Sequence, residues 1–230
     1  LKANLTGPYY AAFDADGTLW NKDMGEQFFQ YQIDHCKLEA LSDIDPWGVY
    51  HSMKLNNPRE AYLWLAQINQ GHSIEQVREW AASAIHDNEN SVFESQKKLI
   101  NLLQDMDIEV FIVTASIQWA VEPAAALVGI PAKNVLGVKT KVDQGIVTTE
   151  QDGPITWRDG KAAALLEQTR NISPIFCSGN TYGDIALLET SLGLKLCIQT
   201  QTCANGLYEE EKHLLDHAKQ SGWLIHHFYN

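Results

Sequence analysis

Short, continuous runs of apolar residues recur along this chain and are separated by segments of helical periodicity. Such runs, bounded by turn residues, are typical of strands buried on both faces of a parallel sheet. Because strand and helix patterns alternate, the sequence predicts βαβ units in a doubly wound, mostly parallel, Rossmann-like α/β sheet. The predicted strands cover 9–13, 108–113, 174–177 and 194–198, and the predicted helices cover 93–103, 117–127, 159–168 and 184–189.

Residues 20–92 interrupt this alternation, because their apolar positions recur at helical spacing and indicate no strand. One of the segments opens on Ser73 with Gln76 three residues later, which is the capping-box pattern of a helix start. About seventy consecutive residues of this kind predict an inserted α-helical cap domain over 20–92. Helices are predicted there at 25–38, 58–68 and 73–85.

The chain on either side of this insertion forms the predicted core domain, which covers 1–19 and 93–230. Within it, the stretch 139–156 has a different pattern, since the turn Asp143-Gln144-Gly145 is followed by β-branched residues. Such a turn between strand-like segments is typical of a β-hairpin. We therefore expect a hairpin flap on an otherwise parallel α/β core.

Composition and charge limit the partners. The 230 residues are 45% hydrophobic and carry 17 Lys and Arg against 29 Asp and Glu, a net charge of −12. That balance disfavours a nucleic-acid backbone or an anionic membrane surface but leaves a small anionic substrate open. The four cysteines show no zinc-site spacing and suit a reducing compartment, although two disulfides would also fit that count. We expect a cytoplasmic protein without membrane spans, although the start at Leu1 also fits a processed or exported form.

Polar residues follow the predicted core strands and carry the candidate chemistry. Asp14 and Asp16 come directly after the first strand, and Thr114 follows the second. Lys161 lies at a helix start, where an ammonium group is unfavourable unless it faces an anion. The segment GNTYGD, residues 179–184, ends a further strand. Ligands of open α/β sheets bind at the carboxyl ends of the strands, so these groups predict one shared site.

These four segments resemble the four motifs of the haloacid dehalogenase superfamily, on its phosphatase side. FDADGT, VTAS, DGK and GNTYGD match them in order, and they span Asp14 to Asp184, most of the chain. A helical insertion directly after the first motif is similar to the phosphoserine phosphatase subgroup, whose cap is a small helical bundle. The second acidic residue, Asp16, favours phosphoester hydrolysis, because dehalogenases need no acid for a halide and usually lack it.

The resemblance implies a role for each motif residue. Asp14 would be the nucleophile that becomes an aspartyl phosphate, and Asp16 would act as general acid and then as general base. Thr114, Lys161 and the backbone N–H of Ala115 would bind the phosphate oxygens. The implied activity is hydrolysis of a small-metabolite phosphomonoester, with a phosphoserine-, phosphocholine- or phosphoethanolamine-like compound as the candidate substrate.

The resemblance also implies a Mg²⁺ cofactor. Its ligands would be the Asp14 carboxylate, the Asp16 carbonyl, and Asn180 and Asp184 of the fourth motif. That motif commonly begins Gly-Asp, whereas this chain has Gly-Asn. An amide oxygen can coordinate Mg²⁺ but carries no charge, so we expect weaker Mg²⁺ binding than an aspartate at position 180 would give.

Substrate choice in this family generally lies in the cap, where the candidate residues are Trp20, Asp23 and Arg59. Trp20 could line an aromatic box for a quaternary ammonium group, Asp23 could bind an amine, and Arg59 could bind a carboxylate. A packed core side chain or a solvated surface charge is the alternative for each. Ala115 and Ser116 stand where phosphoserine phosphatases usually carry two glycines, which leaves the amino-acid end of such a substrate open.

Two other functions would use the same residues. A phosphotransferase or mutase would pass the phosphoryl group from Asp14 to a second hydroxyl, and a catalytically impaired binding protein would keep the pocket without turnover. All four motifs keep groups able to do the chemistry, which disfavours the binding protein. The hydrolase is the leading expectation, and a helical cap does not separate it from the phosphotransferase or mutase. The sequence does not indicate an oligomeric state.

Overall fold

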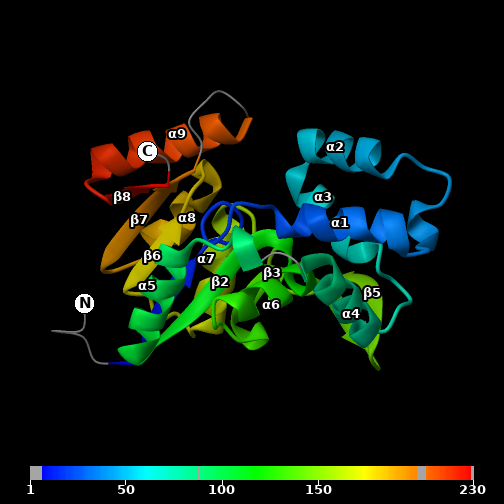
Figure 1. The fold of residues 1–230 in the computed structure, drawn as a ribbon, viewed down its shortest axis with the longest axis horizontal. Coiled ribbons are helices and arrows are strands. Elements are labelled where there is room, and N and C mark those ends of the chain that lie inside the picture. Colours follow the sequence, from blue (N-terminus) through cyan, green and yellow to red (C-terminus); the bar gives the residue numbers. More distant parts are fainter. Residues whose placement is uncertain (1–6, 87–88, 201–205, 229–230) are drawn as a thin grey trace.

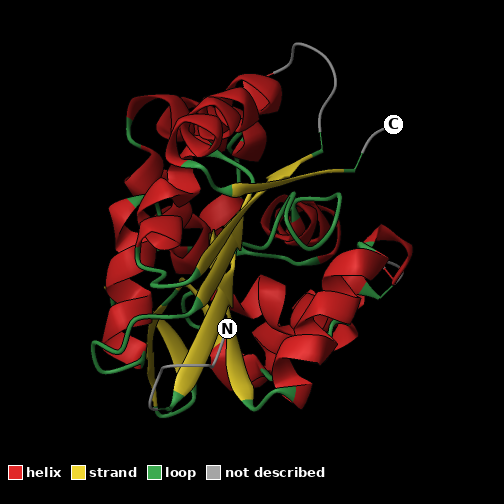
Figure 2. Cartoon of the chain, turned by 90° about the vertical axis from the view of Figure 1, so that its left-hand side faces the viewer, coloured by secondary structure: helices red, strands yellow, loops and turns green. Residues whose placement is uncertain are grey.

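A six-stranded sheet forms the centre of the computed structural model, which describes residues 7–86, 89–200 and 206–228. Its order is β3-β2-β1-β6-β7-β8, and every neighbouring pair is parallel. Figure 2 shows the strands nearly edge-on between helices, which confirms the predicted α/β class. The strands are β1 Tyr9–Phe13, β2 Ile108–Ile117, β3 Val135–Val138, β6 Phe176–Gly179, β7 Leu194–Gln199 and β8 Leu224–His227.

Helices cover both faces of this sheet because the strand side chains alternate between two apolar clusters. Ala11 and Phe13 of β1 pack with residues of α5 and α6. Ala12, between them, packs with Leu165 of α7 and with α8 on the other face. The core helices are α5 Glu94–Asp105, α6 Gln118–Leu127, α7 Asp159–Gln168, α8 Ile185–Glu189 and α9 Gly206–Ser221.

Four helices between β1 and α5 form a separate bundle beside the carboxyl ends of the strands (Figure 1). Its buried residues Phe29, Tyr50 and Leu65 belong to an apolar cluster that also includes Trp119 and Ala120 of α6. Three of the four helices lie where the sequence predicts them, and the second was not predicted. The helices are α1 Met24–His35, α2 Pro46–Asn56, α3 Pro58–Gln67 and α4 Ile74–Ile85.

The hairpin predicted around residues 143–145 packs against this bundle. It consists of β4 Thr140–Asp143 and β5 Ile146–Gln151, which pair antiparallel in a sheet of their own. The backbone N–H of Gly71 donates to the Val147 carbonyl (3.0 Å), and the N–H of Val147 donates to the His72 carbonyl (2.9 Å). The hairpin is thus joined to the loop before α4 by main-chain hydrogen bonds.

The two chain segments that connect core and bundle lie side by side. The N–H of Asn21 donates to the Ser91 carbonyl (3.0 Å), and the N–H of Phe93 donates to the Leu19 carbonyl (2.9 Å). These bonds place the end of the first motif next to the chain that returns to α5.

The described part of the chain contains three of the four cysteines. Cys36, Cys177 and Cys197 are free thiols, while Cys203 lies outside the described part of the chain. No helix in that part is both long and apolar enough to cross a membrane.

Candidate functional site

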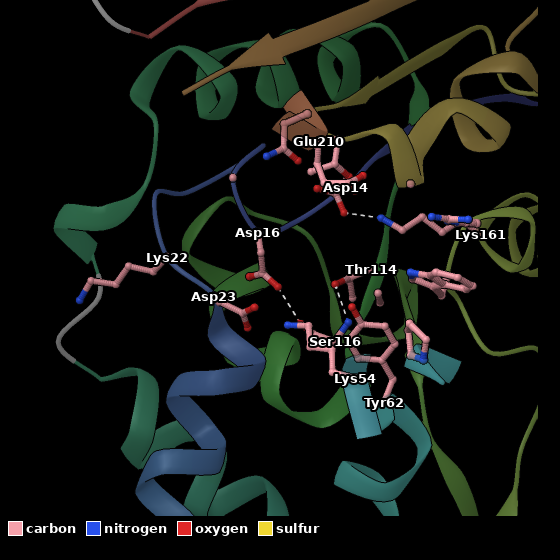
Figure 3. A pocket seen from close by; sticks show the side chains of 18 of the residues that line it. Asp14, Asp16, Lys22, Asp23, Lys54, Tyr62, Thr114, Ser116, Lys161 and Glu210 are labelled. Carbon is pink, nitrogen blue, oxygen red and sulfur yellow. Dashed lines mark hydrogen bonds and ion pairs between the residues drawn. The ribbon is translucent and has the colours of Figure 1, made fainter. Parts of the chain in front are cut away.

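A cavity of about 670 Å³ opens at the carboxyl ends of the core strands, facing the helical bundle. Motif residues from four separate segments line its core side: Asp14, Asp16, Thr114, Lys161 and Asn180. Figure 3 shows the side chains of Asp14, Asp16, Thr114 and Lys161 around the same space. The fold therefore brings together the groups that the sequence placed at strand ends.

Asp14 is the most enclosed carboxylate of the cavity wall, with 6% of its surface exposed. It follows the last residue of β1, and its N–H donates to the Ser178 carbonyl of β6 (2.9 Å). Its Oδ2 accepts the Thr18 hydroxyl (3.0 Å), and its Oδ1 accepts Lys161 Nζ (2.5 Å). Burial and the neighbouring Asp184 carboxylate raise the pKa of Asp14 to about 7, although Lys161 opposes the shift.

Lys161 bridges two carboxylates. It lies in the first turn of α7 and is only 4% exposed, and its Nζ is 2.5 Å from both Asp14 Oδ1 and Asp184 Oδ1. Burial alone would lower the pKa of Lys161, but the two carboxylates raise it above its ordinary value. An ammonium group at a helix start is thus explained here by the anions that it faces.

A glycine allows this close approach. A Cβ on Gly160 would lie 1.8 Å from the Ile155 carbonyl oxygen, so any larger residue would push the start of α7 away from the preceding loop. Gly160 therefore helps to keep Lys161 within reach of Asp14.

Three donors hold the Asp16 carboxylate in place. This carboxylate accepts the indole N–H of Trp20 (2.7 Å), the backbone N–H of Met24 (3.0 Å) and the Ser116 hydroxyl (2.6 Å). Burial raises the pKa of Asp16, while these hydrogen bonds act in the opposite direction. Two carboxylates only two residues apart therefore occupy different environments, as separate catalytic roles require.

The second motif lies on an irregular part of β2. The predicted strand ends at Val113, but β2 continues to Ile117 and its pairing with β3 shifts register after Val113. Thr114, Ala115 and Ser116 line the cavity on this stretch, and the Thr114 hydroxyl accepts the N–H of Ser116 (3.0 Å).

The fourth motif is built around Asn180 and Asp184, both fully buried. Asp184 Oδ2 accepts the backbone N–H groups of Asn180 (3.1 Å) and Thr181 (2.9 Å). Asn180 Oδ1 accepts the Thr18 hydroxyl (3.2 Å), and its Nδ2 donates to Glu211 of α9 (3.2 Å). Sequence reasoning did not identify Glu211, because α9 carries no recognisable motif.

These groups form a set of hard oxygen donors. The Asp14 and Asp184 carboxylates converge on one ammonium group, and the Asn180 amide oxygen is joined to Asp14 through the Thr18 hydroxyl. Across the described ranges, no three or more His, Cys, Asp or Glu side chains are grouped as a metal site. A cation would therefore also need the amide oxygen and a backbone carbonyl, a mixture that suits Mg²⁺.

The bundle side of the cavity carries a mixed set of charges and rings. Asp23, Lys54 and Tyr62 line it, as do Trp157 and Arg158 from the loop before α7. Burial, with the nearby Asp16 and Glu26, raises the pKa of Asp23 to about 8. Its side chain also caps α1, because it accepts the Glu26 N–H (2.8 Å).

Lys54 lies beside two tyrosine rings of the bundle. Its Nζ donates to Glu26 (2.9 Å) and lies 5.2 Å and 5.8 Å from the ring centres of Tyr50 and Tyr62. Lys54, Tyr62 and Trp157 were not expected at the cavity, because their positions in the sequence carry no motif.

Two of the three cap candidates lie elsewhere. Trp20 is fully buried and holds Asp16, so its ring packs in the core and is not among the residues that line the cavity. Arg59 pairs with Asp159 (2.5 Å) and lies over the Trp157 ring, at 5.4 Å from its centre, outside the cavity wall. Neither Trp20 nor Arg59 therefore lines the cavity in this structure, whereas Asp23 does.

Comparisons with known proteins agree with this geometry. The model of the haloacid dehalogenase-like hydrolase family matches residues 11–189. The phosphorylcholine phosphatase of Pseudomonas aeruginosa is 24% identical over an alignment of 246 residues, which covers 79% of this chain and 70% of that protein.

Solved structures share the fold. A protein of unknown function from Bordetella pertussis Tohama I superposes with a TM-score of 0.75 at 16% identity, over 96% of this chain and 98% of that one. A phosphoserine phosphohydrolase-like protein from Francisella tularensis gives a TM-score of 0.59 at 18% identity, over 95% of each chain. The helical bundle is included in both superpositions, since they cover nearly all of this chain.

Proposed function

The chain belongs to the haloacid dehalogenase-like hydrolase family, and from this premise we propose that it hydrolyses small phosphomonoesters through an aspartyl phosphate. The observation that carries the proposal is the buried Asp14 carboxylate at a strand end, paired with Lys161 and facing a cavity that also contains Asp16. A nucleophile, a cation and a second carboxylate in one enclosed space are the groups that phosphoryl transfer requires.

In the first step, an oxygen of the Asp14 carboxylate attacks phosphorus and the bond from phosphorus to the ester oxygen breaks. The leaving alkoxide takes a proton from the Asp16 carboxyl group, whose burial favours the protonated form. Lys161 and the Thr114 hydroxyl hold the phosphoryl oxygens during the transfer. The products of this step are the free alcohol and phosphorylated Asp14.

In the second step, water attacks the same phosphorus from the side that the alcohol has left. Asp16, now ionised, accepts a proton from this water, and the bond between phosphorus and the Asp14 oxygen breaks. Inorganic phosphate leaves, and both carboxyl groups return to their starting protonation states. The three donors to Asp16 keep its carboxylate oriented for both proton transfers.

Mg²⁺ fits the oxygen donors of this site. Asp14, Asn180, Asp184 and the Asp16 carbonyl would hold it, as proposed from the family resemblance. When bound, it would offset the negative charge of the phosphoryl group and of the carboxylates around it. The raised pKa of Asp14 supports the proposal, because Lys161 alone leaves two buried carboxylates incompletely neutralised.

The bundle side of the cavity supports a phosphorylated amino alcohol as substrate. Phosphoserine, phosphocholine and phosphoethanolamine share a cationic nitrogen two carbons from the ester oxygen. Tyr62 and Trp157 offer aromatic faces to such a group. The pKa of Asp23 is about 8, so its ionised form is unfavourable in the cavity. A cationic nitrogen of the substrate beside it would stabilise the ionised form. The similarity to a phosphorylcholine phosphatase agrees with this substrate class.

Turnover of p-nitrophenyl phosphate in the presence of Mg²⁺ tests the proposed activity. We expect measurable hydrolysis by the unmodified protein and a loss of at least about a thousandfold in kcat in Asp14→Asn, which keeps the shape but removes the nucleophile. Asp105→Asn, at the exposed end of α5, is the matched control. No turnover across a panel of phosphoesters that includes the three amino-alcohol esters would favour a binding protein instead.

A further inference from the structure

A buried glutamate on α9 stands directly behind the asparagine of the fourth motif. Glu211 and Asn180 are both fully buried and 31 residues apart in sequence, and Asn180 Nδ2 donates to Glu211 Oε1 at 3.2 Å. We propose that Glu211 positions the Asn180 amide and supplies the negative charge that an aspartate at position 180 would otherwise bring. This inference rests on the proposed Mg²⁺ site.

Glu211 determines which way the amide faces. Its carboxylate oxygens can accept hydrogen bonds but not donate them, so the NH₂ group of Asn180 must point toward α9. A flipped amide would set its oxygen against a carboxylate oxygen, with no hydrogen between them. The orientation that Glu211 imposes leaves Asn180 Oδ1 on the Asp14 side. There the Thr18 hydroxyl lies 3.2 Å from Asn180 Oδ1 and 3.0 Å from Asp14 Oδ2.

Glu211 is itself held in place from the end of β7. Its Oε2 accepts the backbone N–H of Thr200 (2.9 Å), and its Oε1 accepts the Thr200 hydroxyl (2.5 Å). The Gln199 side chain donates to the backbone carbonyl of Glu211 (2.8 Å), which anchors α9 to the same strand end. A buried carboxylate fixed by several donors is a rigid partner for the amide.

The first motif also packs closely against the NH₂ group of this amide. A Cβ on Gly17, which has a φ of +81°, would lie 2.2 Å from Asn180 Nδ2. The amide is therefore confined between the Asp14 loop and Glu211, with little room to rotate. The orientation needed for a cation ligand is set before any cation arrives.

This arrangement separates two properties that an aspartate combines. Asn180 offers the oxygen, and Glu211 carries the charge one hydrogen bond further from the cavity. An aspartate at position 180 would place two buried carboxylates in contact, where they would repel. The asparagine therefore does not simply weaken the site, as the sequence alone led us to expect, because Glu211 compensates for it.

A double-mutant cycle on Asn180 and Glu211, with Mg²⁺ affinity measured by isothermal titration calorimetry and metal-free Tm measured in EDTA, tests the inference. We expect Glu211→Gln to weaken Mg²⁺ binding about tenfold, a typical loss when the partner of a metal ligand is changed. We expect Asn180→Asp to lower the metal-free Tm by about 5–10 °C because of the new carboxylate contact.

The double variant Asn180→Asp/Glu211→Gln moves the charge from one position to the other. It should recover most of the lost Tm and bind Mg²⁺ at least as tightly as the unmodified protein. The sum of the two single changes would instead predict a lower Tm, so the difference measures the interaction between the two sites. Glu209→Gln, exposed on the same helix, removes one charge as the matched control and should change neither measurement.

The failure modes are distinct. If the unmodified protein binds no Mg²⁺, the proposed cofactor is wrong, while the Tm cycle still measures the pairing of Asn180 with Glu211. If the unmodified protein binds Mg²⁺ and Glu211→Gln binds it equally well, the role of Glu211 is overturned and the proposed function stands. Additive Tm changes in the cycle would also overturn it.

Discussion

The two sides of the cavity are built in different ways. On the core side, Asp14, Lys161 and Asp184 follow a core strand or lie at the start of a helix, and Thr114 lies on the irregular end of β2. Hydrogen bonds or ion pairs fix each of them. On the bundle side, Asp23, Lys54 and Tyr62 come from three different helices, and Trp157 comes from a loop of the core.

The core side of the cavity carries the reacting groups, and the bundle side carries the residues proposed to recognise the substrate headgroup. The core side depends on strand ends that any sheet of this topology brings together, so its residues can be identified by their place in the chain. The bundle side depends on how helices pack on one another and against the core. It can therefore change without disturbing the reacting groups, and substitutions on the two sides should have different kinetic signatures.

The largest effect should come from Lys161→Met on the core side. The change leaves Asp14 and Asp184 facing each other without a cation, which we expect to cost about 3–5 kcal/mol of unfolding free energy in EDTA. Turnover should fall by at least about a thousandfold for every phosphoester, because phosphate binding is lost for all of them. Urea unfolding and kcat/KM measure the two losses, with the exposed Lys98→Met as control. A loss of turnover confined to one substrate would contradict the assignment of Lys161 to chemistry that all substrates share.

Lys54→Met on the bundle side should change selectivity instead. Removing this cation leaves Asp23 and Glu26 as uncompensated acidic groups near the cavity, which favours a cationic headgroup over one that also carries a carboxylate. We expect the ratio of kcat/KM for phosphocholine to that for phosphoserine to rise about tenfold. Turnover of p-nitrophenyl phosphate should stay within about twofold. An unchanged ratio would remove Lys54 from headgroup recognition.

Ser116→Ala lies where the two sides meet and should have a smaller effect. The Ser116 hydroxyl stabilises the ionised form of Asp16, so its removal should raise the pKa of Asp16 further. The basic limb of the pH–kcat profile should move to higher pH. The plateau value of kcat should fall by a factor of about three to ten, because Asp16 loses one of the three donors that orient it. A profile that keeps its shape while kcat falls would assign Ser116 to packing alone.

Asp23→Asn should show its effect in the pH dependence of stability. The pKa of Asp23 is about 8 in the folded protein and about 4 when unfolded. Between these values the folded state binds an extra proton, so stability falls as pH rises through that window and levels off above it. Asn caps α1 equally well and does not titrate. The decline in Tm from pH 5 to pH 8 should therefore be smaller in the variant, and equal declines would contradict the assignment.

The core side was largely predictable because its signals are local. A buried strand followed by Asp14, or Lys161 at a helix start, is visible in a few consecutive residues. The same reasoning gave four of the six sheet strands, and missed β3 and β8 because one is four residues long with a central glycine and the other is half exposed. Helix α2 was missed because its only buried residue is Tyr50, so no apolar stripe marks it.

Contacts between distant segments were not predictable. Trp20 was expected at the cavity because it follows the first motif, yet its indole N–H turns back to Asp16 and its ring packs in the core. Glu211 gave no signal, since an acidic residue in a charged helix is normally solvated. Only the packing of α9 against β7 and the fourth motif turns it toward Asn180.

The main-chain hydrogen bonds between the hairpin and the loop before α4 determine which segments must be exchanged together when the bundle is replaced by that of a relative. Exchanging residues 20–92 alone for the corresponding part of a relative would leave the N–H and carbonyl groups of Val147 without the partners that Gly71 and His72 provide, and would uncover its buried side chain. A chimeric enzyme with a new substrate specificity must therefore take the bundle and the β4–β5 hairpin from the same parent, although they are separate segments of the chain.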